Sequence, residues 1–338
     1  MSPIWFFIFV AVAILYFKWL IVHKNVAKDI PGPTGLPIIG SLVTILINWN
    51  RLQEWLEEMY HIYGSTIKIW FIGGPKVIIM VTEPSCVEYI LKSNFNNYVK
   101  GERFHDIMAP LLGNGIFAVD GTLWKKQRQV ASHQFSVNSL KAMVDTFVHH
   151  GHMVLDILKK TTPTEQVDVQ DIFFRYTLDS IGVIAFGKDI GSLRAPQSFA
   201  TAFDNAQAAI DRAFGNPLLA VFPRLNPGLY SNRDILDKYV YGLIQERRCD
   251  SVEVLEAKHD LLSRYMSLVD EDTQRPYSDD YLRDIVLNFI IAGRDTTAQL
   301  LSWTFHMLST HPHHQETLFK EIQQTFPNHE VPDYDTIN

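Results

Sequence analysis

The sequence has few cysteines: Cys86 and Cys249 are the only two among 338 residues. Neither stands in the spacing of a zinc site or a redox pair, and the two do not form the pattern of a disulfide-rich protein. Basic residues are also scarce, since 30 lysines and arginines stand against 37 acidic residues and give a formal net charge of -7. Nucleic-acid-binding proteins usually carry the opposite excess, clustered on one face. We therefore expect folding in a reducing compartment and no nucleic-acid partner.

Metal-binding motifs are missing as well. Two histidine-rich tracts, at 149–152 and 311–314, lack the pair of helical histidines with an intervening glutamate that binds zinc in hydrolases. The sequence contains no internal repeats or low-complexity runs. Hydrophobic residues at 47% and charged residues at 20% are typical of an ordered globular protein with a sizeable core. The sequence thus predicts a folded protein with no metal site formed by its own side chains.

A long hydrophobic run lies at the N-terminus. Residues 4–22 are apolar except for Lys18, which is about the length that one helix needs to cross a bilayer. A cleaved signal peptide carries basic residues before its apolar stretch, whereas Lys24 and Lys28 follow it here and favour a cytoplasmic location for the rest of the chain. A buried core helix is the alternative. We expect a retained single-pass transmembrane anchor over residues 3–22.

A proline-rich segment follows the anchor. Residues 31–37 have the sequence Pro-Gly-Pro-Thr-Gly-Leu-Pro, in which the prolines restrict the backbone and the glycines permit a turn. We interpret residues 23–40 as a basic and proline-rich hinge, and residues 41–338 as one globular domain.

Short strands come early in this domain, and helices dominate afterwards. Asn50 is a candidate cap for a helix that ends near Gly64, and Pro84 fits the first turn of another helix. Residues 67–71 and 77–81 flank a glycine pair and predict a β-hairpin. This order predicts a mainly α fold of the α+β class. Helical spacing then predicts helices over about 122–134, 138–160, 168–186, 200–213, 232–248 and 258–270.

The longest predicted helix runs from Ser278 to about Thr310. Ser278 has the chemistry of an N-cap, two acidic residues follow it in the first turn, and Pro312 ends the helix. Because apolar residues recur on all sides of this helix, we expect it to pass through the core.

Small and polar residues interrupt the middle of this helix. Residues 292–297, Ala-Gly-Arg-Asp-Thr-Thr, include a glycine that costs about 1 kcal/mol relative to alanine. Small side chains at Ala292 and Gly293 would let a flat ligand approach the backbone, and a threonine hydroxyl can bond to a carbonyl one turn back. Asp295 beside Thr296 would provide a route for protons. A helix kink with satisfied polar groups is the alternative.

Trp124 and Arg128 form a second candidate site. They lie four residues apart in a predicted helix and therefore share a face. An indole N–H and a guanidinium both donate hydrogen bonds that suit a carboxylate. For an isolated pair, surface packing with the arginine in solvent is the alternative.

These features together resemble the cytochrome P450 family. Ala-Gly-x-Asp-Thr-Thr in the centre of a long helix is similar to the family's oxygen-activation motif, and Trp-x-x-x-Arg is similar to its motif for gripping a haem propionate. The order of anchor, hinge, hairpin and these two helices also matches. The resemblance implies that Thr296 hydrogen-bonds the iron-bound dioxygen and that Asp295 helps to relay protons. It implies cofactor contacts for Trp124, Arg128, Ala292 and Gly293.

By this resemblance the protein is a haem-thiolate monooxygenase with the P450 fold. It would insert one oxygen atom from O2 into a hydrophobic substrate, with electrons from NADPH through a membrane-bound cytochrome P450 reductase. The implied location is the endoplasmic reticulum membrane, with the catalytic domain in the cytoplasm. Residues 292–303 most resemble the plant and fungal branch that hydroxylates fatty acids or alkanes. Sterols, terpenoids and xenobiotics are the alternative substrates.

Two family motifs do not occur in this sequence. No glutamate is followed three residues later by arginine, and neither Cys86 nor Cys249 stands in the family's haem-ligand loop, Phe-x-x-Gly-x-Arg-x-Cys-x-Gly. That loop supplies the thiolate ligand of the haem. We therefore expect residues 41–338 to be a partial catalytic domain, the N-terminal two thirds of the fold, inactive as it stands and with apolar surface exposed on the long helix. The alternative is a non-catalytic, membrane-anchored protein that keeps the P450 scaffold for binding or regulation.

Overall fold

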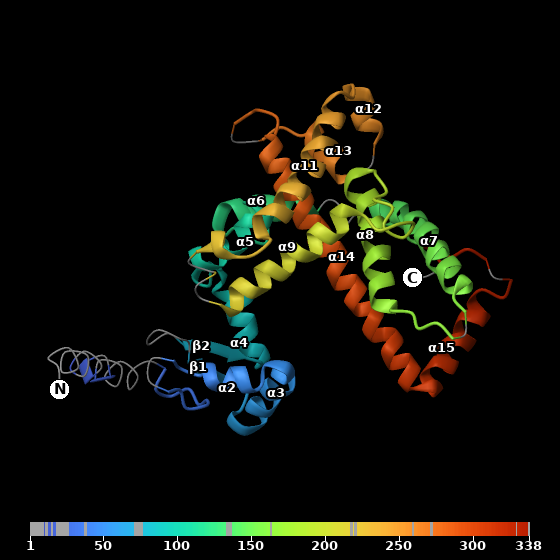
Figure 1. Cartoon of the computed structure of the whole chain (residues 1–338). Coiled ribbons are helices and arrows are strands. Elements are labelled where there is room, and N and C mark those ends of the chain that lie inside the picture. The colour runs from blue at the N-terminus through green and yellow to red at the C-terminus, as the bar shows by residue number, and fades with distance from the viewer. Residues whose placement is uncertain are drawn as a thin grey trace. The chain divides into compact units, whose positions relative to one another are not determined.

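The chain divides into two compact units, Met1–Val99 and Lys100–Asn338. Figure 1 shows the computed structural model. The residues that the structure describes are 10, 13–14, 16–17, 27–36, 39–70, 77–132, 137–162, 164–216, 219, 222–258, 260–270, 273–328 and 330–336.

The predicted anchor at residues 3–22 lies almost wholly outside the described residues. Among the helices that the structure does describe, none is both long and apolar enough to cross a membrane. The single-pass anchor therefore stays a prediction.

The first unit contains the predicted hairpin. Strand β1 (Thr66–Trp70) pairs antiparallel with β2 (Val77–Val81), and Thr66 lies opposite Val81. Both strands are rich in β-branched residues, which suit a pleated surface. The glycine pair at 73–74 that would form the turn lies outside the described residues.

Helices pack against this hairpin to form a small core. Trp55 of α3 (Leu52–Tyr63) is buried against Ile67 and Ile69, which alternate on one face of β1. The unit also contains α2 (Leu42–Ile47) and α4 (Pro84–Glu88), and a proline occupies the first turn of α4 as predicted.

Two details of this unit differ from the sequence-based expectations. Asn50 does not cap α3, because it lies in a short 3-10 turn (Trp49–Arg51) and α3 begins without a side-chain cap. Gly32 lets the proline-rich segment lie close to β1 and does not serve a turn. Lys68 of β1 donates its backbone N–H to the carbonyl of Pro31 at 2.8 Å. A Cβ on Gly32 would lie 2.1 Å from the carbonyl oxygen of Lys68.

The second unit is helical, which confirms the mainly α fold. Its predicted helices begin and end within three residues of those observed. The helix predicted at 258–270 is observed as a shorter one, Leu261–Ser267, because the carboxylate of Asp260 caps its start by accepting the N–H of Ser263. The helices are α5 (Glu102–Leu112), α6 (Gly121–Ser132), α7 (Val137–Lys160), α8 (Val169–Phe186), α9 (Ser198–Gly215), α11 (Leu229–Arg248), α12 (Val252–Ala257), α13 (Leu261–Ser267), α14 (Asp279–Thr310) and α15 (Pro312–Thr325).

The long helix α14 forms as predicted and begins at its predicted cap. The hydroxyl of Ser278 accepts the backbone N–H of Tyr281 at 3.2 Å. Leu282 and its neighbours in the first half are buried in the core. The second half does not pass through the core as predicted, since Leu300 is 67% exposed and Trp303 is 62% exposed. Apolar surface on the long helix is therefore exposed, as expected.

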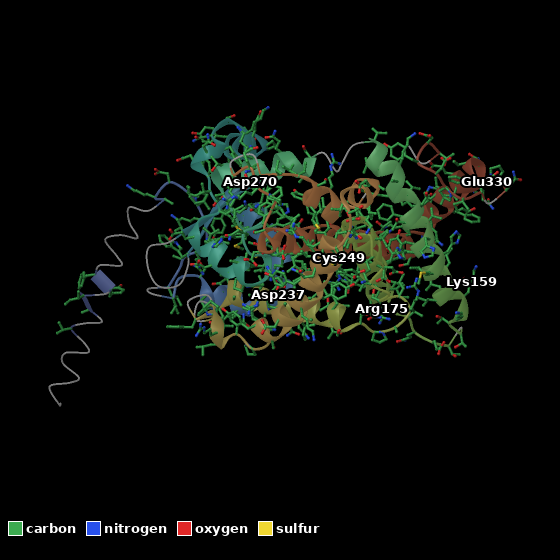
Figure 2. The ribbon with its side chains drawn as sticks, turned by 90° about the horizontal axis from the view of Figure 1, so that it is seen from above. Lys159, Arg175, Asp237, Cys249, Asp270 and Glu330 are labelled. Atoms are coloured by element: carbon green, nitrogen blue, oxygen red, sulfur yellow. The ribbon has the colours of Figure 1, made fainter. Side chains whose placement is uncertain are left out.

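The core of the second unit forms around the first half of α14. Figure 1 shows α14 running diagonally through the unit, with α8 beside it and α9 crossing it. Figure 2 shows the same unit from above with its side chains drawn. The largest fully buried side chains of this core include Phe186 of α8, Phe203 of α9 and Leu236 of α11. Burial of apolar side chains of this size contributes most of the stability of a helical domain.

Candidate functional site

The loop at 113–120, between α5 and α6, is fastened to α14. The backbone N–H of Asn114 donates to the carboxylate of Asp284 at 2.7 Å, and the N–H of Phe117 donates to the side-chain oxygen of Asn288 at 3.1 Å. The amide nitrogen of Asn288 donates in turn to the carbonyl of Leu112 at 2.9 Å. Buried side chains of α14 thus satisfy backbone groups that would otherwise lack partners.

The same loop positions α6. Gln127 of α6 is buried, and its amide nitrogen donates to the carbonyl of Asn114 at 2.8 Å. Two glycines allow the approach: a Cβ on Gly113 would lie 1.9 Å from a carboxylate oxygen of Asp284, and a Cβ on Gly115 would lie 1.8 Å from the amide nitrogen of Asn288. The helix that carries Trp124 and Arg128 is therefore held to the helix that carries the acid and the alcohol.

A buried ion pair supports this attachment. Arg283 of α14 pairs with Asp237 of α11 at 2.6 Å and with Asp284 at 2.9 Å. Burial raises the pKa of Asp284, and the opposing hydrogen bonds from the Asn114 N–H and Arg283 stabilise its charged form. The sequence analysis did not identify these residues. The sequence does contain a signal for them, because Arg283, Asp284 and Asn288 are polar residues within an otherwise apolar stretch of the predicted helix.

Trp124 and Arg128 lie on one face of α6, as predicted. Trp124 is half-buried, and Arg128 is exposed and makes no hydrogen bond or ion pair with the part of the chain that the structure describes. Lys100 adds a second cation beside Trp124, with its ammonium 5.8 Å from the centre of the ring. Burial lowers the pKa of Lys100, opposed by the nearby charge of Asp120. Lys100 is distant in sequence, and the sequence analysis missed it.

Thr296 makes the predicted bond to a carbonyl one turn back. Its hydroxyl donates to the carbonyl of Ala292 at 2.6 Å. Ala292 is half-buried and Thr296 is exposed, and a separation of four residues places them on the same side of α14. This side carries the small residue and the hydroxyl that the predicted ligand contact requires.

Asp295 is oriented differently from Thr296. One carboxylate oxygen accepts from Arg294 at 3.1 Å, and the other accepts from the side chain of Gln207 on α9 at 2.5 Å. Burial raises the pKa of Asp295, and the positive charge of Arg294 opposes this effect. The structure thus brings Asp295 together with α9, a partner that the sequence analysis did not predict.

Gly293 has a packing role in the structure. A Cβ at this position would lie 2.6 Å from the side chain of Ile181 on α8, so the glycine lets α8 and α14 pack closely. This contact explains the glycine without a ligand. Its predicted contact with a cofactor stays a prediction, as does that of Ala292.

Neither cysteine belongs to the group of residues described above. Cys249 is exposed at the end of α11 (Figure 2), and its thiol contacts the carbonyl of Gln245 at 3.4 Å. Cys86 is half-buried in α4 of the first unit. In the described part of the chain, no group of three or more histidine, cysteine, aspartate or glutamate side chains could hold a metal ion.

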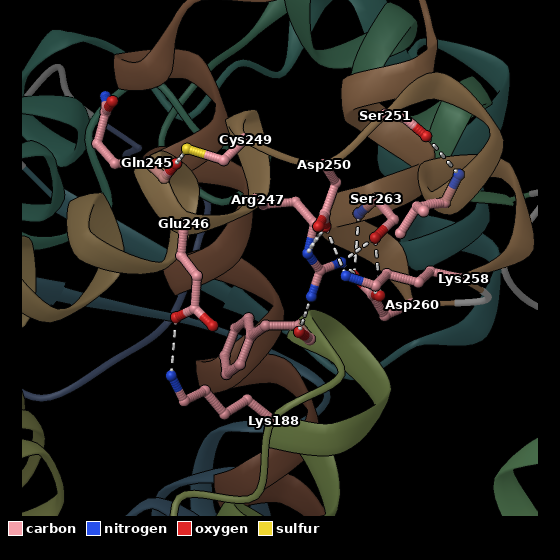
Figure 3. A network of polar contacts seen from close by, with 12 residues as sticks. Lys188, Gln245, Glu246, Arg247, Cys249, Asp250, Ser251, Lys258, Asp260 and Ser263 are labelled. Atoms are coloured by element: carbon pink, nitrogen blue, oxygen red, sulfur yellow. Dashed lines mark hydrogen bonds and ion pairs between the residues drawn. The ribbon is translucent and has the colours of Figure 1, made fainter.

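A large hollow elsewhere in the second unit contains none of the predicted site residues. Its volume is about 990 Å³, and α7, α8, α11 and α13 contribute to its walls. Figure 3 shows the charged network in its wall: Arg247 pairs with Asp260 at 2.7 Å and donates to the carbonyl of Phe186, and Lys258 pairs with Asp250 at 2.5 Å. These charged groups serve as hydrogen-bond and ion-pair partners for one another, so we assign the network a structural role.

Comparison with known proteins identifies the family. A sequence model described as cytochrome P450 matches residues 30–338. The chain belongs to the cytochrome P450 family. The fold agrees: the crystal structure of the cytochrome P450DA heme domain superimposes with a TM-score of 0.73 over 91% of this chain and 66% of that chain, at 23% sequence identity.

Curated relatives of this chain include proteins from plants and a fungus. Cytochrome P450 704B1 of Arabidopsis thaliana is 34% identical over 93% of this chain and 63% of its own length. Cytochrome P450 704C1 of Pinus taeda is 37% identical over 87% of this chain and 59% of its own. Cytochrome P450 monooxygenase cyp1 of Mycosarcoma maydis is 36% identical over 88% of this chain and 48% of its own. The chain thus spans about half to three fifths of these relatives.

Haem is the cofactor of P450 proteins, and its iron supplies the oxygen chemistry when it is bound. The indole of Trp124 and the exposed guanidinium of Arg128 suit a propionate, and the Ala292–Thr296 side of α14 suits a flat ring. Neither Cys86 nor Cys249 lies in the family's ligand loop. The residues present therefore fit the propionate and oxygen-side contacts of a haem and do not supply its thiolate ligand.

Proposed function

We propose that this P450 chain forms the oxygen-side part of a haem-thiolate monooxygenase, which inserts one oxygen atom from O2 into a hydrophobic substrate. The observation that carries the proposal is the side of α14 formed by Ala292 and Thr296. It presents a small residue and a hydroxyl, while Gly293, about 100° further round the helix from Ala292, packs on α8.

Each predicted residue has a role within this proposal. Trp124 and Arg128 would hold a propionate through their N–H donors, and α6 is suitably fixed to α14 for this. Thr296 would hold a proton at its hydroxyl oxygen, next to the reacting oxygen. Asp295 would replace that proton from solvent, for which a carboxyl with a raised pKa is suited.

Substrate and partners follow from the same proposal. The resemblance of residues 292–303 to the fatty-acid and alkane hydroxylases favours an aliphatic substrate, hydroxylated near its end. Electrons would come from NADPH through cytochrome P450 reductase in the endoplasmic reticulum membrane, to which residues 3–22 would anchor the chain. A protein that hydroxylates sterols but not fatty acids would contradict the substrate assignment.

A second candidate is a membrane-anchored P450-like protein that binds or regulates without catalysis. The specific observation in its favour is the absence of a thiolate ligand beside α14, since Cys249 lies at the end of α11 and lacks the ligand-loop sequence. Sequencing of the transcript beyond the codon for Asn338 distinguishes the two. Continuation into Glu-x-x-Arg and the cysteine loop supports the monooxygenase, whereas a stop codon supports the second candidate.

The polypeptide encoded by that transcript provides the direct test. It should convert a long-chain fatty acid to a hydroxylated product in the presence of NADPH and reductase. Thr296→Ala and Asp295→Asn should each lower the rate by about 100-fold, as expected for loss of a positioned proton donor. Thr304→Ala is the matched control, because Thr304 is exposed on the same helix and bonds the carbonyl of Leu300 at 2.7 Å in the same way. Equal rates for T296A and T304A would contradict the proposal.

A further inference from the structure

Arg294, the residue before the predicted proton donor, is held almost entirely inside the protein. Its side chain is 4% exposed, and its guanidinium lies 4.7 Å from the ring centre of Phe174 on α8 and 5.4 Å from that of Phe203 on α9. It pairs with Asp204 of α9 at 2.5 Å and with Asp295 at 3.1 Å. Stacking on two rings and pairing at both ends leave the guanidinium little freedom to move.

Gln207 of α9 completes the arrangement. Its amide nitrogen donates to one carboxylate oxygen of Asp295 at 2.5 Å, while Arg294 donates to the other oxygen. Asp204 and Gln207 are three residues apart, so both lie on the side of α9 that faces α14. One oxygen of Asp295 is therefore held directly by α9, and the other is held by Arg294, which itself pairs with Asp204 of α9.

A hollow reaches the same group. Its volume is about 340 Å³, and Asp171 of α8, Asp204 of α9 and Arg294 of α14 are among its lining residues. The buried Nε of Arg294 has no hydrogen-bond partner in the described part of the chain. A buried N–H of this kind is usually satisfied by water. The hollow is large enough to admit water beside Arg294.

We propose that Gln207 and the Arg294–Asp204 pair are positioning residues for Asp295, and that they make the orientation and protonation of its carboxyl depend on α9. The importance of Asp295 for catalysis rests on the function proposed above. The positioning itself rests only on the contacts of α9 with α14.

The charges around Asp295 predict opposite effects for the two α9 residues. Gln207 donates to the carboxylate and so stabilises its charged form, whereas Asp204 repels it and competes for Arg294. Arg294 and Asp204 are the charged groups that act on Asp295 from α14 and α9. Loss of the Gln207 amide should therefore raise the pKa of Asp295, and loss of the Asp204 charge should lower it.

The experiment measures the titration of Asp295 in the full chain, without haem or substrate. Aspartate labelled with carbon-13 at the carboxyl is incorporated, and Asp295→Asn identifies the resonance. We expect Gln207→Leu to raise the titration midpoint and Asp204→Asn to lower it, each by about 0.5 pH or more. Gln170→Leu is the matched control, because Gln170 lines the same hollow, is exposed and bonds Gln299 instead of Asp295.

Three outcomes decide the proposal. Opposite displacements for Q207L and D204N with an unchanged Q170L support it. Unchanged midpoints in both α9 variants, or equal displacements in Q207L and Q170L, overturn it. If Q207L does not fold, as circular dichroism would show, Gln207→Asn keeps an amide that is too short to reach and should give the same upward displacement. Because no turnover is measured, failure of the monooxygenase proposal would leave this result unaffected.

Discussion

Asn288 of α14 accepts a hydrogen bond from the backbone of Phe117 at 3.1 Å, although 171 positions separate the two in sequence. The same side chain donates to the carbonyls of Leu112 and Asp284. One buried amide therefore joins the loop before α6 to the middle of the core helix, and it determines where Trp124 and Arg128 lie relative to α14.

Replacement of Asn288 by alanine should destabilise the second unit by about 1–3 kcal/mol, because the buried N–H of Phe117 and the carbonyl of Leu112 lose their partner. The measurement is the free energy of unfolding in urea. Asn205→Ala on α9 is the control, since Asn205 is exposed and its removal should change stability by less than about 0.5 kcal/mol. A similar cost for both variants would show that the Asn288 contacts are unimportant.

Two glycines should respond oppositely to alanine. Gly115→Ala places a methyl group 1.8 Å from the anchored amide of Asn288 and should cost about 1–3 kcal/mol through overpacking. Gly151 lies within α7, and a Cβ there meets no atom within 4 Å. Gly151→Ala should therefore stabilise the protein, by up to about 1 kcal/mol, because alanine favours the helix. Thermal denaturation of both variants tests the pair, and destabilisation by G151A would contradict it.

The buried ion pair of Arg283 should be sensitive to the loss of one partner. Arg283→Met leaves Asp284 buried without its cation and should cost about 3–5 kcal/mol. Arg175→Met, which removes an exposed pair with Asp171 one turn away on α8, should cost less than about 1 kcal/mol. Urea unfolding compares the two. If R283M is as stable as the wild type, the charge of Asp284 is not held by Arg283.

His150 predicts a pH dependence of stability. It is buried in α7 with its ring nitrogen 3.0 Å from the hydroxyl of Ser180, and desolvation lowers its pKa, opposed by the charge of Asp189. The imidazole of His150 therefore takes up its proton at a higher pH in the unfolded chain than in the folded one. Neutral His150 contributes fully to the stability of the folded protein above pH 6.5, and this contribution is lost as the pH falls through the folded pKa.

The variant His150→Gln should lack this part of the pH dependence. Free energies of unfolding measured in steps from about pH 7.5 to pH 5 should fall less steeply for H150Q than for the wild type. The exposed His152 of the same helix provides the control, because His152→Gln should keep the wild-type slope. An equal pH dependence of the free energy of unfolding for H150Q and the wild type would show that His150 is not responsible for it.

The chain as it stands should not give a thiolate-haem spectrum. Reduced, carbon monoxide-treated samples should lack the band of a thiolate ligand, because Cys86 and Cys249 lie in unrelated surroundings. Appearance of that band would contradict this expectation. The variants Cys86→Ser and Cys249→Ser would then show which thiolate binds the iron.

Local features of the sequence predicted the helices well. The extent of α14, its cap at Ser278 and the Thr296–Ala292 bond depend on residues within one or two turns of each other, whose chemistry is visible in the sequence. The helix predicted at 258–270 is shorter in the structure, Leu261–Ser267, for a related reason. Asp260 caps α13 from inside an apolar pattern that looks continuous, and a cap of this kind competes with helical periodicity.

The partners of the site residues could not be predicted in this way. Asp295 and Thr296 were expected to act as neighbours, yet the carboxylate bonds to Gln207, 88 positions away, and Gly293 accommodates Ile181 of α8. Which side of a helix meets which neighbour depends on packing among several helices at once, and no local pattern encodes it.

The amino-acid sequence by itself therefore determined where the helices begin and end, the spacing of the acid, the alcohol and the Trp–Arg pair, and through these the family. Only the tertiary structure decided the orientation of Asp295, the attachment of α6 through Asn288 and the need for glycine at Gly115. The physical reason is distance along the chain. Turns and caps satisfy groups a few residues apart, whereas buried amides, carboxylates and guanidinium groups find their partners only when distant helices pack together.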